Sequence, residues 1–82
     1  MRSGEGDENV ELVCLVRGHP HPHVTWTKDG RPIKLNQHIR QTQTTHRHTL
    51  RISNVSRRDF GTYLCIADNT QGKDSEVIQL TG

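Results

Sequence analysis

The seven residues DFGTYLC, positions 59–65, decide how this 82-residue chain folds. Tyr63, Cys65 and Ala67 put an apolar side chain at every second position, which is the period of a half-buried β-strand. The polar run at 56–60 reads as a connection before this strand, and DNTQG at 68–72 reads as a hairpin after it. The segment therefore predicts a strand that follows a polar turn and ends in a hairpin.

The same alternation recurs on both sides of this strand. Apolar residues with strand spacing are Val10, Leu12, Cys14, Val16, Val24, Trp26, Leu50, Ile52, Val55, Ile78 and Leu80. Prolines and glycines interrupt the pattern at 18–22 and 28–30. Between 31 and 45 the pattern is weaker, although Ile33, Leu35 and Ile39 offer enough apolar side chains for one or two edge strands. About seven short strands without helical periodicity predict an all-β antiparallel sandwich.

The two cysteines, Cys14 and Cys65, lie too far apart in the chain for a CxxC redox pair or a metal knuckle. A long-range disulfide is the simplest interpretation. A chain of this length buries only about 60% of the surface that its unfolded form exposes, so a covalent link matters. Such a bridge would stabilise the fold by roughly 4 kcal/mol and would point to an oxidising compartment.

Three quoted patterns carry a family resemblance. They are Cys14 followed by Trp26 and by D-x-G-x-Y-x-C at 59–65, the loop sequence GHPHPHVTWTKDG at 18–30, and the sequence ADNTQG at 67–72. Together they resemble the immunoglobulin superfamily, and more closely its I-set. The resemblance covers roughly residues 7–82 and implies a Greek-key sandwich. On residues 66–72 and 80–82 the chain also looks like adhesion molecules of the lachesin and IgLON kind, which is a weaker match.

The resemblance implies roles for the core signature. Trp26 is expected to pack across the disulfide, and the Tyr63 hydroxyl to return to the backbone of the preceding turn. Gly61 would supply backbone freedom there. Asp59 would accept hydrogen bonds from nearby backbone donors or from a basic side chain, with Arg40 as the expected partner.

The resemblance also implies a domain layout. Residues 1–6 are expected to be a linker or an added start, and 7–82 a single I-set domain. I-set domains normally begin with a strand ahead of the acidic turn that resembles residues 6–8 here, so a truncated first strand and a bare edge on the strand after it are expected. No stretch is long and apolar enough to span a bilayer, so no direct membrane insertion is expected.

Strand parity predicts one candidate protein-binding face. It sends Leu64, Ile66 and Val77 outward together with Thr25 and Thr27. Clustered exposed aliphatic residues often mark an interface, which could be homophilic. Scattered surface aliphatics that bind nothing are an equally good interpretation of the same residues.

Basic residues are concentrated in the middle of the chain. Between positions 28 and 58 the chain has one acidic residue, Asp29, and eight basic residues: Lys28, Arg31, Lys34, Arg40, Arg47, Arg51, Arg57 and Arg58. The last five arginines are the candidate anion band, and heparan sulfate is the candidate ligand, because arginine binds sulfate through paired donors. His38, His46 and His48 would strengthen the band below pH 6.5. Nucleic acid is not expected, since no aromatic residues interleave with these charges. The alternative is a solvated surface without a ligand.

The remaining candidates favour plain interpretations. His19, His21 and His23, with His46 and His48, invite a metal hypothesis, but polar loop residues explain them better and no metal or cofactor is expected. Asn54-Val55-Ser56 is an N-glycosylation sequon, although the same wording is ordinary for this strand in I-set domains. Nothing resembles a nucleophile elbow or a buried base, so no enzyme is expected.

These observations predict a non-enzymatic extracellular module of a larger protein. Its role would be recognition or spacing in a multi-Ig cell-surface adhesion or matrix protein with a protein partner. The alternative is an intracellular structural Ig domain of a sarcomeric or cytoskeletal protein, in which the cysteines stay reduced.

Overall fold

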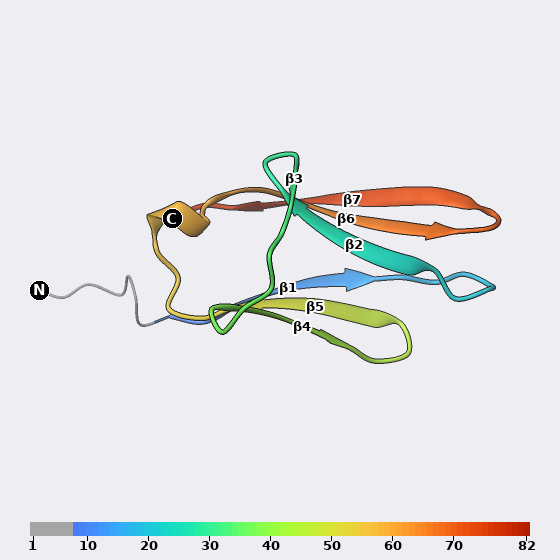
Figure 1. The fold of residues 1–82 in the computed structure, drawn as a ribbon, viewed down its shortest axis with the longest axis horizontal. Helices are drawn as coiled ribbons and strands as arrows, with labels where there is room; N and C mark the ends of the chain where they lie inside the picture. Colours follow the sequence, from blue (N-terminus) through green and yellow to red (C-terminus); the bar gives the residue numbers. More distant parts are fainter. Residues whose placement is uncertain (1–7) are drawn as a thin grey trace, which may run out of the picture.

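A computed structural model describes residues 8–82, which form seven β-strands and one short 3-10 helix (Figure 1). In chain order the elements are β1 (Val10–Leu15), β2 (His23–Lys28), β3 (Arg31–Pro32), β4 (Ile39–Gln43), β5 (Arg47–Ile52), η1 (Arg57–Asp59), β6 (Gly61–Asn69) and β7 (Gly72–Leu80). The expected linker at residues 1–6 lies outside the described residues.

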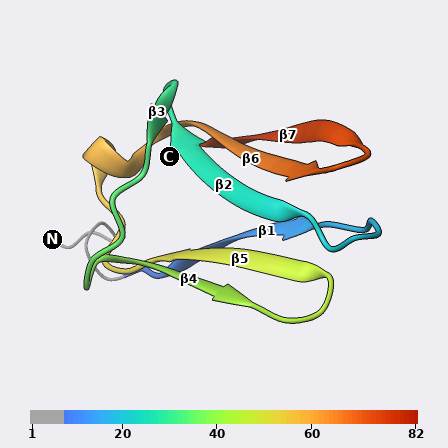
Figure 2. The same ribbon diagram turned by 45° about the vertical axis from the view of Figure 1, so that its right-hand side comes forward.

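The strands form two antiparallel sheets that face each other, as Figures 1 and 2 show. One sheet has the strand order β1-β5-β4 and the other has the order β3-β2-β6-β7. The chain crosses between the sheets after β1, β3 and β5, and this Greek-key path confirms the predicted immunoglobulin-like sandwich. The predicted hairpin is also confirmed, because Asn69 pairs with Gly72 and leaves Thr70 and Gln71 as its two-residue loop.

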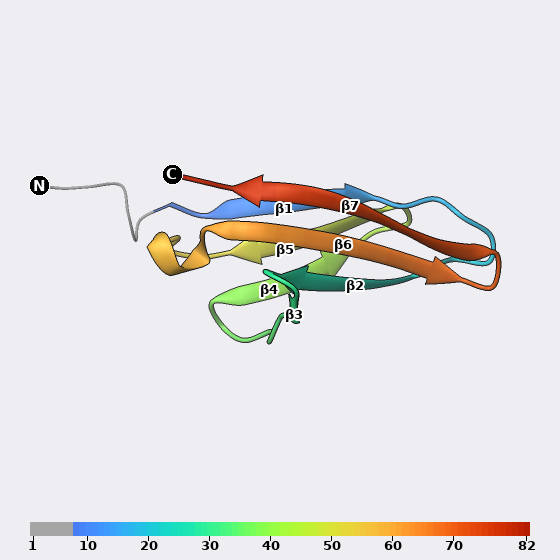
Figure 3. The same ribbon diagram turned by 90° about the horizontal axis from the view of Figure 1, so that it is seen from above.

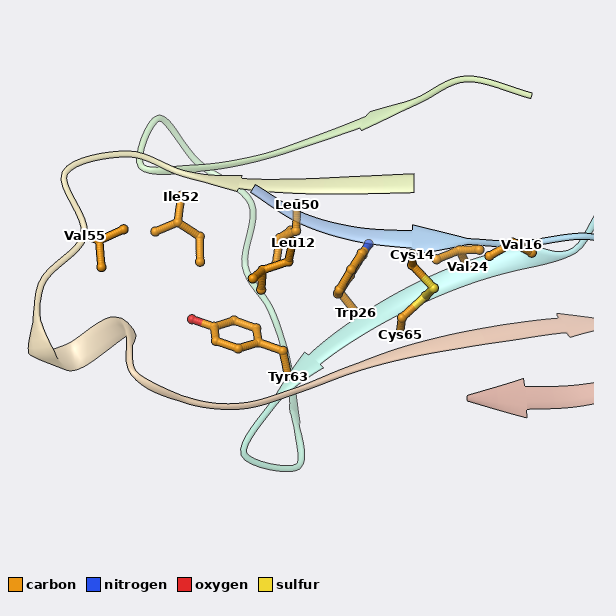
Figure 4. Packing of buried hydrophobic residues seen from close by; sticks show 10 residues of the cluster. All are labelled: Leu12, Cys14, Val16, Val24, Trp26, Leu50, Ile52, Val55, Tyr63 and Cys65. Carbon is orange, nitrogen blue, oxygen red and sulfur yellow. A yellow bond between two sulfur atoms is a disulfide. The ribbon is translucent and has the colours of Figure 1, made fainter. Parts of the chain in front are cut away.

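The core lies between the sheets and uses the inward residues of the alternating pattern. Cys14 on β1 and Cys65 on β6 form a disulfide whose Cα atoms are 6.5 Å apart, and this bond joins the two sheets. Trp26 on β2 lies opposite Cys65 on β6 and packs beside the disulfide, as Figure 4 shows. Leu50 and Ile52 on β5 are fully buried in the same core, and each such burial is worth about 1.5–3 kcal/mol.

Tyr63 fixes the start of β6 against the turn before it. Its side chain is fully buried, and its hydroxyl donates a hydrogen bond to the carbonyl oxygen of Asp59. Burial, with smaller contributions from the carboxylates of Asp59 and Asp29, raises the pKa of Tyr63 to about 12. The phenol therefore stays neutral and keeps its donor role.

The buried carboxylate of Asp59 is held by two groups that are close to it in space. It accepts a hydrogen bond from the backbone N–H of Ser56 at 2.9 Å, and Nε2 of His38 lies 2.9 Å from its other oxygen. The expectation that Arg40 would be its partner was wrong. Arg40 lies opposite Arg51 in the register and is exposed, so its side chain belongs to the outer face of the sheet.

The weak pattern at residues 31–45 becomes two short edge strands, β3 and β4. Ile33 and Ile39 pack against the core, as their apolar character predicts. Leu35 does not, because it lies in the loop between these strands and is 53% exposed.

One side of the sandwich is open within the described residues. Among residues 8–82 no strand precedes β1, so β1 and β7 each have a strand neighbour on one side only. Figure 3 shows both strands along the same side of the molecule. An open cavity of about 320 Å³ lies there, lined by residues 14–17 at and just beyond the end of β1 and by residues 65, 67 and 74–76 of β6 and β7.

We expect Gly61→Ala to destabilise the fold by roughly 2–3 kcal/mol, because a Cβ there needs strained backbone and meets a carboxylate. Gly61 has a φ of 157°, and its Cβ would lie 2.8 Å from both carboxylate oxygens of Asp29. That carboxylate accepts a hydrogen bond from the N–H of Thr62 at 3.0 Å and so cannot retreat freely. Urea unfolding of the purified domain measures the loss.

The matched control is Gly72→Ala. Gly72 has a similar φ of 148° but no atom within 4 Å of an added Cβ. The Gly72→Ala variant should lose only the part of the unfolding free energy that comes from the strained backbone. Equal losses at the two positions would show that the contact with Asp29 is not what excludes a side chain at Gly61.

Candidate interaction surfaces

The outer side of the four-stranded sheet brings all five residues of the predicted binding face together. Val24, Trp26, Tyr63 and Cys65 point into the core, so the alternate residues of β2 and β6 point out. The register then aligns the outward residues in rows: Thr27 with Leu64 and Val77, and Thr25 with Ile66 and Ser75.

The strand residues of three successive rows of this surface are uncharged, although the Asp29 carboxylate lies beside the outermost row, where it accepts a hydrogen bond from the N–H of Thr62. The middle row, that of Leu64, extends to β3, where Pro32 lies opposite Thr27, and the row next to it along β6 pairs Thr62 with Gln79. Val77 is 58% exposed, while Leu64 and Ile66 are half-buried by their neighbours. We call this surface the Leu64 face and define it by Pro32, Thr25, Thr27, Thr62, Leu64, Ile66, Ser75, Val77 and Gln79. Its lack of charge stands out in a chain of which 24% is charged.

The basic residues between positions 28 and 58 do not form one continuous surface. Three lie on the outer side of the three-stranded sheet, which we call the arginine face: Arg40, Arg47 and Arg51. The others lie elsewhere: Lys28 and Arg31 on the four-stranded sheet, Lys34 in the loop before β4, and Arg57 and Arg58 on η1. The predicted anion band is therefore divided, because its five arginines lie partly on the three-stranded sheet and partly on η1. A count of charges along the sequence does not reveal this division.

His48 is buried at the end of the core, where sequence reasoning had treated it as a surface residue. It is 1% exposed, and neither ring nitrogen has a hydrogen-bond partner in the described part of the chain. Its ring stacks on that of His21 with centroids 5.7 Å apart. Burial, followed by the charge on His21, lowers the pKa of His48. The expectation that His48 adds charge to a basic band below pH 6.5 was therefore wrong.

The other histidines are spread over the molecule. His38 contacts Asp59, whereas His19, His23 and His46 are exposed. Within residues 8–82 no three His, Cys, Asp or Glu side chains form a group that could hold a metal ion. The described residues also contain no helix long and apolar enough to cross a bilayer.

Asn54 of the sequon lies in the turn between β5 and η1. It is exposed and has a φ of 51°, and its side-chain amide has no hydrogen-bond partner among residues 8–82. Its backbone N–H donates a hydrogen bond of 3.2 Å to the side-chain oxygen of Asn9, which directly precedes β1. The amide is thus accessible to a modifying enzyme, and its modification stays a prediction.

The sandwich, with its inter-sheet disulfide, packed tryptophan and tyrosine-anchored turn, defines an immunoglobulin domain. The chain belongs to the I-set family, because the family model described as "Immunoglobulin I-set domain" matches residues 3–81. Domains of this family and fold are typically non-enzymatic structural or binding modules.

The relatives include proteins of different kinds. The chain is 45% identical over 74 residues to hemicentin-2 of Mus musculus, 44% over 78 residues to the muscle M-line assembly protein unc-89 of Caenorhabditis elegans, and 36% over 73 residues to neural cell adhesion molecule 1 of Bos taurus. These alignments cover 90%, 93% and 89% of this chain but only 1%, 1% and 9% of the relatives. The chain thus corresponds to one module of each relative.

Solved structures give the same fold. The titin M3 domain superposes with a TM-score of 0.85 at 32% identity, covering 92% of this chain and 78% of that one. Because the relatives include both a cell adhesion molecule and a muscle assembly protein, kinship alone leaves the compartment open.

We expect His48 to make the domain less stable in acid. Its folded-state pKa is lowered, so the unfolded chain binds more protons than the folded one once the pH falls below about 6.5. The stability that depends on neutral His48 is complete above that pH and is lost as the pH falls toward the folded-state pKa. His48→Leu should flatten the fall in unfolding free energy between pH 7.5 and pH 5, measured by urea unfolding at each pH.

His46→Gln is the control, because His46 is exposed two positions away. It should keep the pH dependence of the parent chain. If His48→Leu kept it too, burial of this imidazole would not be the cause of the acid sensitivity.

Proposed function

We propose that this chain is an extracellular recognition or spacer domain of a larger multi-Ig adhesion or matrix protein. The disulfide between Cys14 and Cys65 carries the proposal, because such bridges form and persist in oxidising compartments and are rare in the cytosol. The kinship with neural cell adhesion molecule 1 supports an adhesive role. A binding or spacing role also fits a family whose domains are typically structural or binding modules.

The Leu64 face is the proposed site of protein recognition. Interface cores are depleted of charge, and the three uncharged rows across this sheet match that property. Leu64, Ile66 and Val77 supply the aliphatic area, while the threonine side chains beside them offer hydrogen-bonding groups. The proposed partner is another protein or a second copy of the parent protein.

The second candidate is an intracellular structural domain of a muscle or cytoskeletal protein. The 44% identity to the muscle M-line assembly protein unc-89 and the match to the titin M3 domain favour it. In that setting the two cysteines would stay reduced and the domain would bear load. The alternatives differ in the chemical state of Cys14 and Cys65, which makes them separable.

Asn54 belongs to the extracellular proposal. In a secreted or cell-surface host, its exposed and unbonded amide would be available for N-glycosylation. A glycan in this turn would leave the Leu64 face uncovered, because the turn lies between β5 and η1 rather than on the four-stranded sheet.

We expect Leu64→Glu combined with Ile66→Glu to weaken recognition by the parent protein. A carboxylate at the centre of an apolar contact loses its hydration without gaining a partner, so binding should fall by at least about tenfold. Binding of the full-length ectodomain to cells that express the partner, or to beads coated with the same ectodomain, measures this loss.

Leu35→Glu provides the matched control. Leu35 is an exposed leucine in the loop between β3 and β4, outside the Leu64 face. It should leave binding unchanged. Unchanged partner binding and self-association in the double variant would mean that the Leu64 face is idle.

A further inference from the structure

The arginine face is a second surface with a chemistry of its own. On β1 and β5 the residues Leu12, Cys14, His48, Leu50 and Ile52 point into the core. The alternate residues therefore face outward, and the register aligns them as Glu11 with Arg51 and Arg40, Val13 with Thr49 and Thr42, and Leu15 with Arg47. This surface lies on the opposite side of the sandwich from the Leu64 face.

The arginine face holds more positive charge than its own acids neutralise. Arg40 and Arg51 lie directly opposite each other on neighbouring strands, an arrangement that repels. Glu11 is the acid of this surface, and one of its oxygens lies 3.6 Å from Nε of Arg51. Within residues 8–82 neither Arg40 nor Arg47 has an acidic partner. Two exposed guanidinium groups are thus left to attract anions.

The spacing of these charges fits a chain of anions better than a single one. Arg47 and Arg51 are four residues apart on one strand face, which corresponds to about 13 Å at roughly 3.3 Å per residue. Thr42 lies between the two ends and adds an exposed hydroxyl group that can donate to oxygen acceptors, whereas Thr49 beside it is buried. The result is an elongated donor surface with cations at both ends.

We propose that the arginine face binds a sulfated polysaccharide. Sulfate groups repeat along such a polymer, and a guanidinium group binds each through paired N–H donors. No aromatic residue lies on this surface to stack nucleic acid bases. As a biological ligand the polysaccharide presupposes the extracellular placement proposed above, whereas the binding itself does not and is measured separately.

Binding of the 82-residue chain to immobilised heparin at 0.15 M NaCl tests the proposal. Arg40→Gln combined with Arg47→Gln should weaken binding by about tenfold or more, because charge-assisted hydrogen bonds to sulfate are lost. Arg31→Gln combined with Lys34→Gln removes the same charge from exposed positions outside the arginine face, and it should weaken binding by less than about threefold through the long-range field alone. Urea unfolding verifies that both variants are folded, and Arg40→Gln alone, on edge strand β4, gives a second measurement.

Three comparison ligands decide what the surface recognises. Desulfated heparin, oligothymidylate and phosphatidylserine vesicles should each bind more weakly than heparin. Equal losses in the two double variants would overturn the proposal, because general charge would then explain the binding. Equal binding of desulfated heparin, or tighter binding of the oligonucleotide or the vesicles, would overturn it as well, and a failure of this kind leaves recognition through the Leu64 face untouched.

Discussion

The bond between Cys14 and Cys65 is the constraint on which the rest of this structure depends. It joins β1 of one sheet to β6 of the other, with Trp26 packed against it. In a small chain with a hydrophobic content of 29%, a bridge worth roughly 4 kcal/mol is comparable to the net stability of a typical domain. The two sheets are thereby held at a fixed separation, which the buried side chains fill.

Both candidate surfaces follow from that constraint. Once Cys14 and Cys65 point inward, the twofold period of a strand fixes which neighbours point outward. Leu64 and Ile66 flank Cys65 on β6 and must lie on the outside of their sheet. In the other sheet, inward Cys14 pairs with inward His48, so Arg51 and its partner Arg40 lie outside. One side of the sandwich carries the uncharged Leu64 face and the other carries the arginine face, so the domain offers two chemically different surfaces to two kinds of partner.

The sequence predicted the sandwich, its core and the outward residues because local alternation records them. It did not predict contacts that depend on how distant segments meet. His38 rather than Arg40 reaches Asp59, and this depends on the path of the loop before β4. His48 continues the inward series of Leu50 and Ile52, so strand parity could have placed it, and it was missed because a polar imidazole was assigned to the surface. The ring of His21 stacks on it. The basic stretch looked continuous in sequence and is divided because the chain crosses between sheets after β3 and β5.

The thiol state of Cys14 and Cys65 in the parent protein from its native source tests the central claim most directly. Free thiols are alkylated under denaturing conditions before and after reduction, and peptides that contain each cysteine are compared by mass spectrometry. An extracellular, disulfide-bonded domain predicts that both cysteines are labelled only after reduction. Full labelling of both before reduction would contradict it and would favour the intracellular structural domain.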